Sequence, residues 1–456
     1  MNRRDFLKTA GFAAASLPIC QSVFGADGSE ESGMSKEQLL EQADRRIREY
    51  RKAKAVLKLV GPEAKNFYPG LTVKVEQASH KFLFGSNIFR LHRCGSPQAN
   101  TSYEKHFAQL LNFATLPFYW ARYEAEKGKP DDARTREIVK WCKENNIIPK
   151  GHPLSWNISE PKWLPKSPEK AMQVQLERIR QCIERFKGDI DIWDVVNEAT
   201  HYNRDDFLEN APILSGAIAK MGVGEYVRSA FKTARQANPD ATLIINDYRV
   251  DDEFEKRVIS QLVDEDRQPL YDVIGIQSHM HNGYWGIEKA WNICEKFAKF
   301  GKPLHFTELT ILSGKLKDAN DTDWRTRRKD WPSTEEGEKQ QAKQICEFYT
   351  LLFSHPAVEA ITVWDFADYN SWQGAPSGYL REDLTPKPVY NQLKELIKGK
   401  WWTNTKAIIT TDGTASFRGF LGQYKITTTV KGRKLIGSFR LDKDLKETIE
   451  VRLTGV

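Results

Sequence analysis

The sequence of 456 residues lacks several features that would assign it to a common class of protein. Its six cysteines contain no Cys-X-X-Cys pair and no metal-ligand cluster, so we expect no structural metal site and no disulfide framework. No long run of Lys and Arg occurs although the formal net charge is +7, because basic residues alternate with acidic ones. This pattern is typical of a mixed, solvated surface, and we expect no nucleic-acid partner.

Long apolar runs are missing as well. The apolar stretch over residues 9–24 is short and rich in Ala and Gly, so it would not span a bilayer, and no other stretch approaches the required length. Arg3-Arg4 and Phe6-Leu7-Lys8 precede it, a pattern that resembles a bacterial twin-arginine export signal. We therefore expect a signal peptide over residues 1–25, no membrane span, and an exported protein that is periplasmic or extracellular.

Aromatic residues, in contrast, are abundant. The chain has 13 Trp, 15 Tyr and 23 Phe. Such a number is compatible with a sugar-binding cleft lined by aromatic rings, and equally with the core of a large enzyme. Composition alone does not decide between these two interpretations.

The order of patterns along the chain predicts five segments. Residues 26–54 read as a linker followed by a helix, which Ser35 would cap with Gln38 three residues on, and which would end near Lys54. Residues 55–81 alternate apolar and polar side chains around Pro69-Gly70, as in a short β element. Residues 82–400 would form the main domain, and residues 401–456, rich in β-branched side chains, a small all-β module.

The main domain alternates short apolar runs with amphipathic stretches, such as the expected helices over 134–145 and 170–186. Eight strands and their helices over roughly 300 residues suit an α/β fold of the (β/α)₈ TIM-barrel type. A doubly wound open sheet is the competing fold, but no Gly-rich phosphate loop follows any of the expected strands. The eight expected strands are 82–87, 112–118, 147–154, 191–196, 242–247, 273–277, 303–308 and 360–365.

Two of these apolar runs end in a carboxylate. Glu198 follows the fourth expected strand, and Glu308 ends the seventh. Reactive residues of barrel enzymes lie at the carboxyl ends of the strands, so the two side chains would face each other across the mouth. Glycoside cleavage needs such a pair, because one group protonates the leaving oxygen while the other attacks carbon or activates water.

Six short motifs in this order resemble those of glycoside hydrolase family 10, the family of many endo-β-1,4-xylanases, over residues 82–398. Each motif alone is weak, but their common order makes the resemblance specific. The motifs are Gly151-His-Pro-Leu-Ser-Trp156, Trp193-Asp-Val-Val-Asn-Glu-Ala199, Ile245-Asn-Asp-Tyr248, Ile276-Gln-Ser-His279, Thr307-Glu-Leu309, and the pair Trp364 and Trp372.

The resemblance implies a retaining mechanism, in which Glu198 is the general acid/base and Glu308 the nucleophile. It implies β-1,4-linked polysaccharide as the substrate, with xylan as the default, and no cofactor. It also implies a set of residues that bind the sugar by hydrogen bonds or apolar faces. These are His152, Trp156, Asn197, Tyr248, Gln277, His279, Trp364 and Trp372.

The sequence departs from the family pattern around this pair. Leu116 and Tyr119 stand where the family usually has an Asn and a Lys that grip the next sugar on the glycone side. Asn157 replaces a His, and Thr310 replaces the Asp that would orient His279. These changes put the substrate in doubt more than the chemistry, with Arg122 and Tyr119 as candidate substitutes for the missing contacts.

Three other functions stay open. The same chemistry could act on a different β-glycan or a decorated oligosaccharide, and a catalytically weak carbohydrate-binding protein is the alternative from another class. A metal-dependent barrel hydrolase is disfavoured, because His279 and His281 have no evident carboxylate partner in the sequence. The C-terminal module either braces the barrel, which we favour, or binds sugar through Trp401 and Trp402. The oligomeric state is unknown from the sequence.

Overall fold

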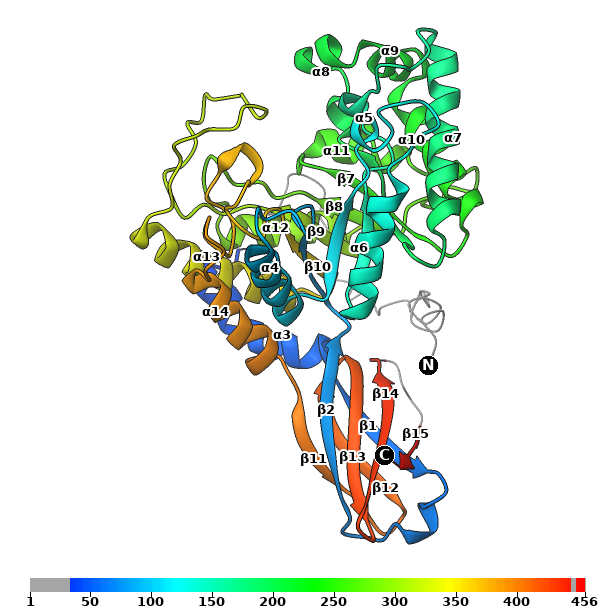
Figure 1. Ribbon diagram of the computed structural model, residues 1–456, viewed down its shortest axis with the longest axis vertical. Helices are drawn as coiled ribbons and strands as arrows, with labels where there is room; N and C mark the ends of the chain where they lie inside the picture. Colours follow the sequence, from blue (N-terminus) through cyan, green and yellow to red (C-terminus); the bar gives the residue numbers. More distant parts are fainter. Residues whose placement is uncertain (1–32, 444–447, 456) are drawn as a thin grey trace.

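The computed structural model describes residues 33–443 and 448–455, so the predicted signal peptide lies outside the described residues. Two bodies are visible, a barrel domain and a β-sandwich that extends from one of its ends (Figure 1). Within the described part of the chain, no helix is long and apolar enough to cross a membrane.

The main domain is a closed barrel of eight parallel strands in chain order, which confirms the predicted (β/α)₈ class. Each strand lies within two residues of its predicted bounds, because every one is a short buried run between amphipathic segments. The strands are β3 (Leu83–Asn87), β4 (Phe113–Pro117), β5 (Ile148–His152), β6 (Ile192–Asn197), β7 (Thr242–Asp247), β8 (Val273–Ile276), β9 (Leu304–Leu309) and β10 (Val358–Val363).

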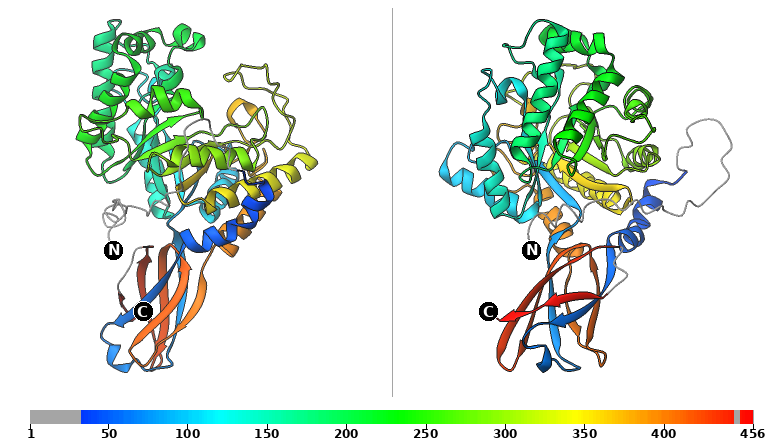
Figure 2. Two further views of the ribbon diagram at one scale, coloured as in Figure 1. Left: turned by 180° about the vertical axis from the view of Figure 1, so that it is seen from behind. Right: turned by 90° about the vertical axis from the view of Figure 1, so that its right-hand side faces the viewer.

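Helices surround the barrel (Figure 2) and bury their apolar faces against it. The two helices predicted over 134–145 and 170–186 are α6 and α7, each beginning two residues earlier than expected. The helices of this layer are α4 (Pro97–Leu110), α5 (Trp120–Tyr123), α6 (Asp132–Glu144), α7 (Pro168–Phe186), α8 (Asp205–Asn210), α9 (Pro212–Met221), α10 (Val223–Ala237), α11 (Asp252–Arg257), α12 (Ile287–Ala298), α13 (Glu335–Ser354) and α14 (Pro388–Glu395).

The N-terminal helix is shorter than predicted. Ser35 caps α2 (Lys36–Glu41) in a capping box with Gln38, as expected, and α3 (Ala43–Tyr50) follows. The prediction of a helix to about Lys54 is wrong, because β1 (Lys52–Val60) already begins there. Its residues alternate between buried and exposed and pair with a C-terminal strand, and this sheet pairing outweighs the local helical tendency.

The β elements at the two ends of the chain form one sandwich rather than two separate units. Strand β1 pairs with β12, and β2 (Thr72–His80) pairs with β11 and β13, so each sheet joins residues more than 300 positions apart. Their inner faces share one apolar core. The C-terminal strands are β11 (Asn404–Ile408), β12 (Thr414–Phe420), β13 (Gly422–Val430), β14 (Arg433–Leu441), β15 (Ile449–Arg452) and β16 (Thr454–Gly455).

The sandwich is fixed to the amino-terminal end of the barrel, since β2 leads into β3. Trp401 is buried at this junction and stacks on Phe353, with ring centroids 4.5 Å apart. Trp402 packs against His80, whose Nε2 lies 3.0 Å from the carbonyl oxygen of Ile397. Both tryptophans therefore contact the barrel and its last helical turn, on the side away from the mouth, which supports the bracing role.

Candidate active site

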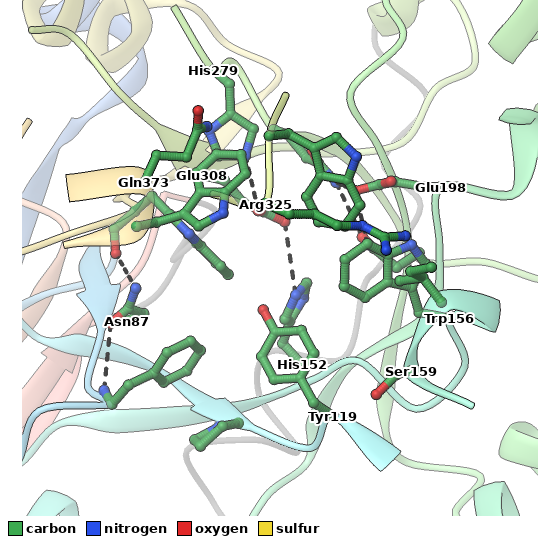
Figure 3. A pocket seen from close by; sticks show the side chains of 18 of the residues that line it. Asn87, Tyr119, His152, Trp156, Ser159, Glu198, His279, Glu308, Arg325 and Gln373 are labelled. Atoms are coloured by element: carbon green, nitrogen blue, oxygen red, sulfur yellow. Dashed lines mark hydrogen bonds and ion pairs between the residues drawn. The ribbon is translucent and has the colours of Figure 1, made fainter. Parts of the chain in front are cut away.

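The structure brings all ten residues predicted from the sequence into one cleft. The cleft has a volume of about 960 Å³ and lies at the carboxyl ends of the barrel strands (Figure 3). Its lining includes Glu198, Glu308, His152, Trp156, Asn197, Tyr248, Gln277, His279, Trp364 and Trp372.

Glu308 lies near the end of β9 and is held in its ionised form by its neighbours. Asn246 Nδ2 donates to its Oε1 at 2.8 Å, and His279 Nε2 lies 3.2 Å from its Oε2. His152 Nε2 lies 3.9 Å from Oε1. Burial alone would raise the pKa of Glu308, but the charge of His152 and the hydrogen bond from His279 outweigh it, so the pKa falls below 4.5.

Glu198 follows β6 and has the opposite electrostatic setting. Gln277 Nε2 donates to its Oε1 at 3.0 Å, and its backbone has the left-handed φ of 56°, which is uncommon for a residue with a side chain. Burial raises the pKa of Glu198 to about 8, and the negative charges of Asp247 and Glu308 add to this effect against the hydrogen bond from Gln277. The site therefore pairs a protonated carboxyl group with an ionised one at neutral pH.

Three amides connect the two carboxylates. Asn197 Oδ1 accepts from Asn246 Nδ2 at 2.8 Å and from Gln277 Nε2 at 3.2 Å, so the amides fix one another's orientation. Asn246 was not singled out from the sequence, although a polar residue in the apolar run of β7 is a signal that could have found it. Gly275 on β8 leaves room for it, because a Cβ atom there would lie 2.4 Å from Asn246 Oδ1.

A buried ion-pair network orients His152. Asp194 Oδ2 lies 2.6 Å from Lys150 Nζ and 2.7 Å from His152 Nδ1, and all three side chains are buried. Burial alone would raise the pKa of Asp194, but Lys150 and His152 lower it. With Nδ1 held by Asp194, the Nε2 of His152 faces Glu308. Lys150 and Asp194 were not identified from the sequence, because charged residues in a strand interior give no direct sign of pairing.

Aromatic rings form the walls of the cleft. Trp372 packs on His279 with centroids 4.7 Å apart, and Trp364 lies 5.4 Å from His152. The ring of Tyr119 packs near those of His152 and Trp156, with centroid distances of 5.6 and 5.9 Å. Such apolar faces suit the C–H groups of sugar rings.

The departures from the family pattern have different structural consequences. Leu116 is fully buried in the core, whereas Tyr119 and Arg122 line the cleft. Asn157 is also buried and donates to the carbonyl oxygen of Tyr202 at 2.8 Å, so it fixes a loop. Thr310 Oγ1 lies 3.5 Å from Nδ1 of His279, so the hydroxyl occupies the position of the expected orienting carboxylate.

Among residues 33–443 and 448–455, no group of three or more His, Cys, Asp or Glu side chains is arranged to hold a metal ion. Separately from this, a protonated and an ionised carboxyl group in one cleft can offer proton donation and nucleophilic attack. This is the pairing that acid-assisted displacement at a sugar carbon requires.

The chain is similar to known proteins. The family model described as Glycosyl hydrolase family 10 matches residues 75–396. Endo-1,4-beta-xylanase B of Thermotoga neapolitana is 27% identical over 297 residues, covering 62% of this chain and 78% of that protein. Endo-1,4-beta-xylanase 1 of Arabidopsis thaliana is 25% identical over 425 residues, covering 89% of this chain but only 40% of its own length.

A solved structure shares the fold. Xylanase 10B from Thermotoga petrophila, in complex with xylobiose, is 25% identical, covers 70% of this chain and 95% of its own, and gives a TM-score of 0.56. A further relative, 27% identical over 409 residues, is the anti-sigma-I factor RsgI6 of Acetivibrio thermocellus; the match covers 87% of this chain and 47% of that protein.

Proposed function

Because the chain belongs to glycosyl hydrolase family 10, we propose that it is a glycosidase that cleaves β-1,4-linked polysaccharide with retention of configuration. The observation that carries this proposal is a pair of carboxyl groups in one cleft whose pKa values are shifted in opposite directions. The pKa of Glu198 is raised to about 8, while that of Glu308 is lowered below 4.5. Two carboxyl groups with such separated pKa values are suited to the roles of acid and nucleophile.

The reaction would proceed in two steps. Glu308 attacks the anomeric carbon, while Glu198 gives its proton to the departing glycosidic oxygen, so a covalent glycosyl-enzyme forms. Glu198, now ionised, then takes a proton from water, which attacks the same carbon and releases Glu308. The charge of His152 and the hydrogen bond from His279 keep Glu308 ionised for attack.

The remaining cleft residues would bind the sugar. His152, Asn197 and Gln277 present polar groups beside the carboxylates, and Trp364 and Trp372 present apolar faces. Asn197 would bind the sugar 2-hydroxyl, a contact that gains strength as the ring distorts toward the transition state. Trp156, Tyr248 and His279 complete the proposed binding set.

Xylan is the default substrate, since the xylanases among the relatives carry that activity in their names. A decorated, acidic glycan is the second candidate, and a specific observation favours it. Arg93 and Arg122 line the cleft, are exposed, and have no carboxylate partner among the described residues. They could bind an anionic substituent where the usual neutral contacts are missing.

Binding without turnover is the alternative from another class, and one relative bears the name of an anti-sigma factor rather than a hydrolase. The decisive experiment measures release of reducing ends from xylan, glucuronoxylan and mixed-linkage glucan, with Glu308→Ala beside the wild type. Cleavage that disappears in the variant supports the proposal and identifies the substrate. Sugar binding without cleavage by the wild-type protein would refute it.

We also propose export through the segment that begins at Arg3-Arg4. Replacing both arginines by lysine should retain the full-length precursor in the cytoplasm of a host with a twin-arginine export system. Normal export of that variant would contradict the proposal.

A further inference from the structure

The connection between β9 and α13 forms a long loop beside the cleft, and we refer to its residues 315–331 as the strap (Figure 1). The strap leaves and returns at one point, because Gly314 and Ser333 form an antiparallel bridge at its base. Gly314 is required there, since a Cβ atom would lie 2.3 Å from the carbonyl oxygen of Pro332.

One side of the strap is attached to the loops that follow β8 and β10. Arg328 donates from its backbone to the carbonyl oxygen of Gln373 at 2.8 Å and from its guanidinium to Gln373 Oε1 at 3.0 Å. Asn282 Nδ2 donates to the carbonyl oxygen of Asp318 at 2.7 Å. These contacts hold the strap against the Glu308 side of the mouth.

The other side reaches the loops that follow β5 and β6. Trp324 Nε1 donates to Asp206 Oδ2 of α8 at 2.8 Å. The centroid of the Trp324 ring lies 6.0 Å from that of Trp156 and 6.1 Å from that of Phe207. Arg325 adds a hydrogen bond to the carbonyl oxygen of Asp206 at 3.1 Å. The strap therefore connects opposite sides of the barrel mouth.

The tip of the strap is held in shape by its own contacts. Asp323 Oδ1 accepts from the backbone N–H groups of Arg325 and Thr326, both at 3.0 Å. Lys317 Nζ donates to the carbonyl oxygen of Asp323 at 2.8 Å. These contacts join residues of the strap to one another, so they fix the shape of its tip.

The strap crosses the mouth on the Glu198 side. The guanidinium of Arg204 lies 5.3 Å from the centroid of the Trp324 ring and forms an ion pair with Asp206. Its positive charge lowers the pKa of Glu198, against the effect of burial. Because Glu198 would protonate the leaving oxygen, the sugars of the leaving group must lie beside it. Trp324 and Arg325 line the cleft and contact Asp206 of α8 there.

We propose that the strap limits the leaving-group side of the cleft, so that glycan chains are cut near the reducing end rather than at internal bonds. The inference rests on the proposed glycosidase activity, since it assigns Glu198 to the leaving group. Trp324 is the residue that sets the limit, because its ring joins the strap to both Trp156 and Phe207.

The test maps the bonds that are cut in xylohexaose. The sugar carries oxygen-18 at its reducing end, because a bulky label would itself be excluded, and products are identified by mass spectrometry. The wild type should cut mainly the bonds nearest the label. The double variant Trp324→Ala, Arg325→Ala should raise the ratio of internal to terminal cuts by at least about tenfold, because a steric limit of one ring is removed.

Lys329→Ala is the matched control, since Lys329 is an exposed cation of the same strap and is expected to leave the cutting pattern unchanged. An even spread of cuts in the wild type, or an unchanged ratio in the double variant, would overturn the inference while leaving the glycosidase proposal intact. If neither xylohexaose nor an aryl β-xyloside is hydrolysed, xylan fails as the proposed substrate, and the inference fails with it.

Discussion

The proton carried by Glu198 is the most direct point at which the mechanism can be tested. With a pKa of about 8, about ten molecules hold this proton at pH 7 for each one that has lost it. With an ordinary pKa of 4.5, only about one molecule in 300 would hold it. The buried position of Glu198 thus increases the population of competent acid about 300-fold at neutral pH, and Glu198→Ala removes that acid.

The assay compares kcat/KM across pH for a natural oligosaccharide and for a dinitrophenyl glycoside, whose leaving group needs no proton. In the wild type, the oligosaccharide rate should fall above pH 8 as Glu198 ionises, and also in acid, below pH 4.5, as Glu308 gains a proton. In Glu198→Ala, kcat/KM should fall by about 10²–10⁴-fold for the oligosaccharide but little for the aryl glycoside. The alkaline limb of the pH profile, which is the fall in kcat/KM above pH 8, should vanish in this variant.

Asp365 makes a suitable control because it lines the same cleft and burial raises its pKa to about 7. Asp365→Asn should keep the alkaline limb near pH 8. An alkaline limb that persists in Glu198→Ala, or that moves in Asp365→Asn instead, would refute the assignment of the acid. Equal losses on both substrates in Glu198→Ala would also contradict it, because a proton donor matters only to the poor leaving group.

Four further variants, one of them a control, test stability in the site and at the junction between the two domains. The folded-state pKa of Glu198 lies above its unfolded value, so the contribution of Glu198 to stability is fully present below pH 4.5 and is lost as pH rises to 8, because the unfolded chain releases the proton first; Glu198→Gln should therefore melt higher than wild type at pH 8 and similarly at pH 4. Trp401→Ala should cost about 3–5 kcal/mol in the free energy of unfolding in urea, because a buried junction ring is lost, whereas Ile408→Ala at an exposed site should change it by less than about 0.5 kcal/mol. Lys150→Met should cost about 3–5 kcal/mol by the same measurement, because the buried charge of Asp194 loses Lys150 and keeps only His152 beside it; an unchanged unfolding midpoint would show that Lys150 and Asp194 are not a stabilising ion pair.

The barrel could be predicted from the sequence because the apolar residues of its strands and of its helices follow different patterns. Each strand is a buried run such as Thr242–Asp247, and each intervening helix repeats its apolar residues at helical spacing. The sandwich could not be predicted as one unit, since β1 and β12 lie at opposite ends of the chain and alternation alone does not identify a partner strand. The helix predicted to reach Lys54 was too long for the same reason, because a distant strand decided where it ended.

The candidate site was predictable to the extent that chemistry requires particular residues at strand ends. Glu198 and Glu308 each follow an apolar run, so their meeting at the mouth follows from the barrel. The residues that hold these two side chains and their neighbours in position were not predictable. Asn246 and Lys150 act through contacts between different strands, and a single sequence does not show which side chain faces which.

The loops carry the part of the function that the barrel does not determine. Strand ends hold Glu198 and Glu308 in place, so the proposed reaction depends on the barrel rather than on the loops. The strap and the exposed Arg122 belong to connections between strands and helices, where length and side chains can change without disturbing the barrel. Loss of the usual strand-two contacts at Leu116 therefore does not imply loss of catalysis. Under the proposed function, recognition would rest on rim residues such as Trp324 and Arg122, which line the cleft.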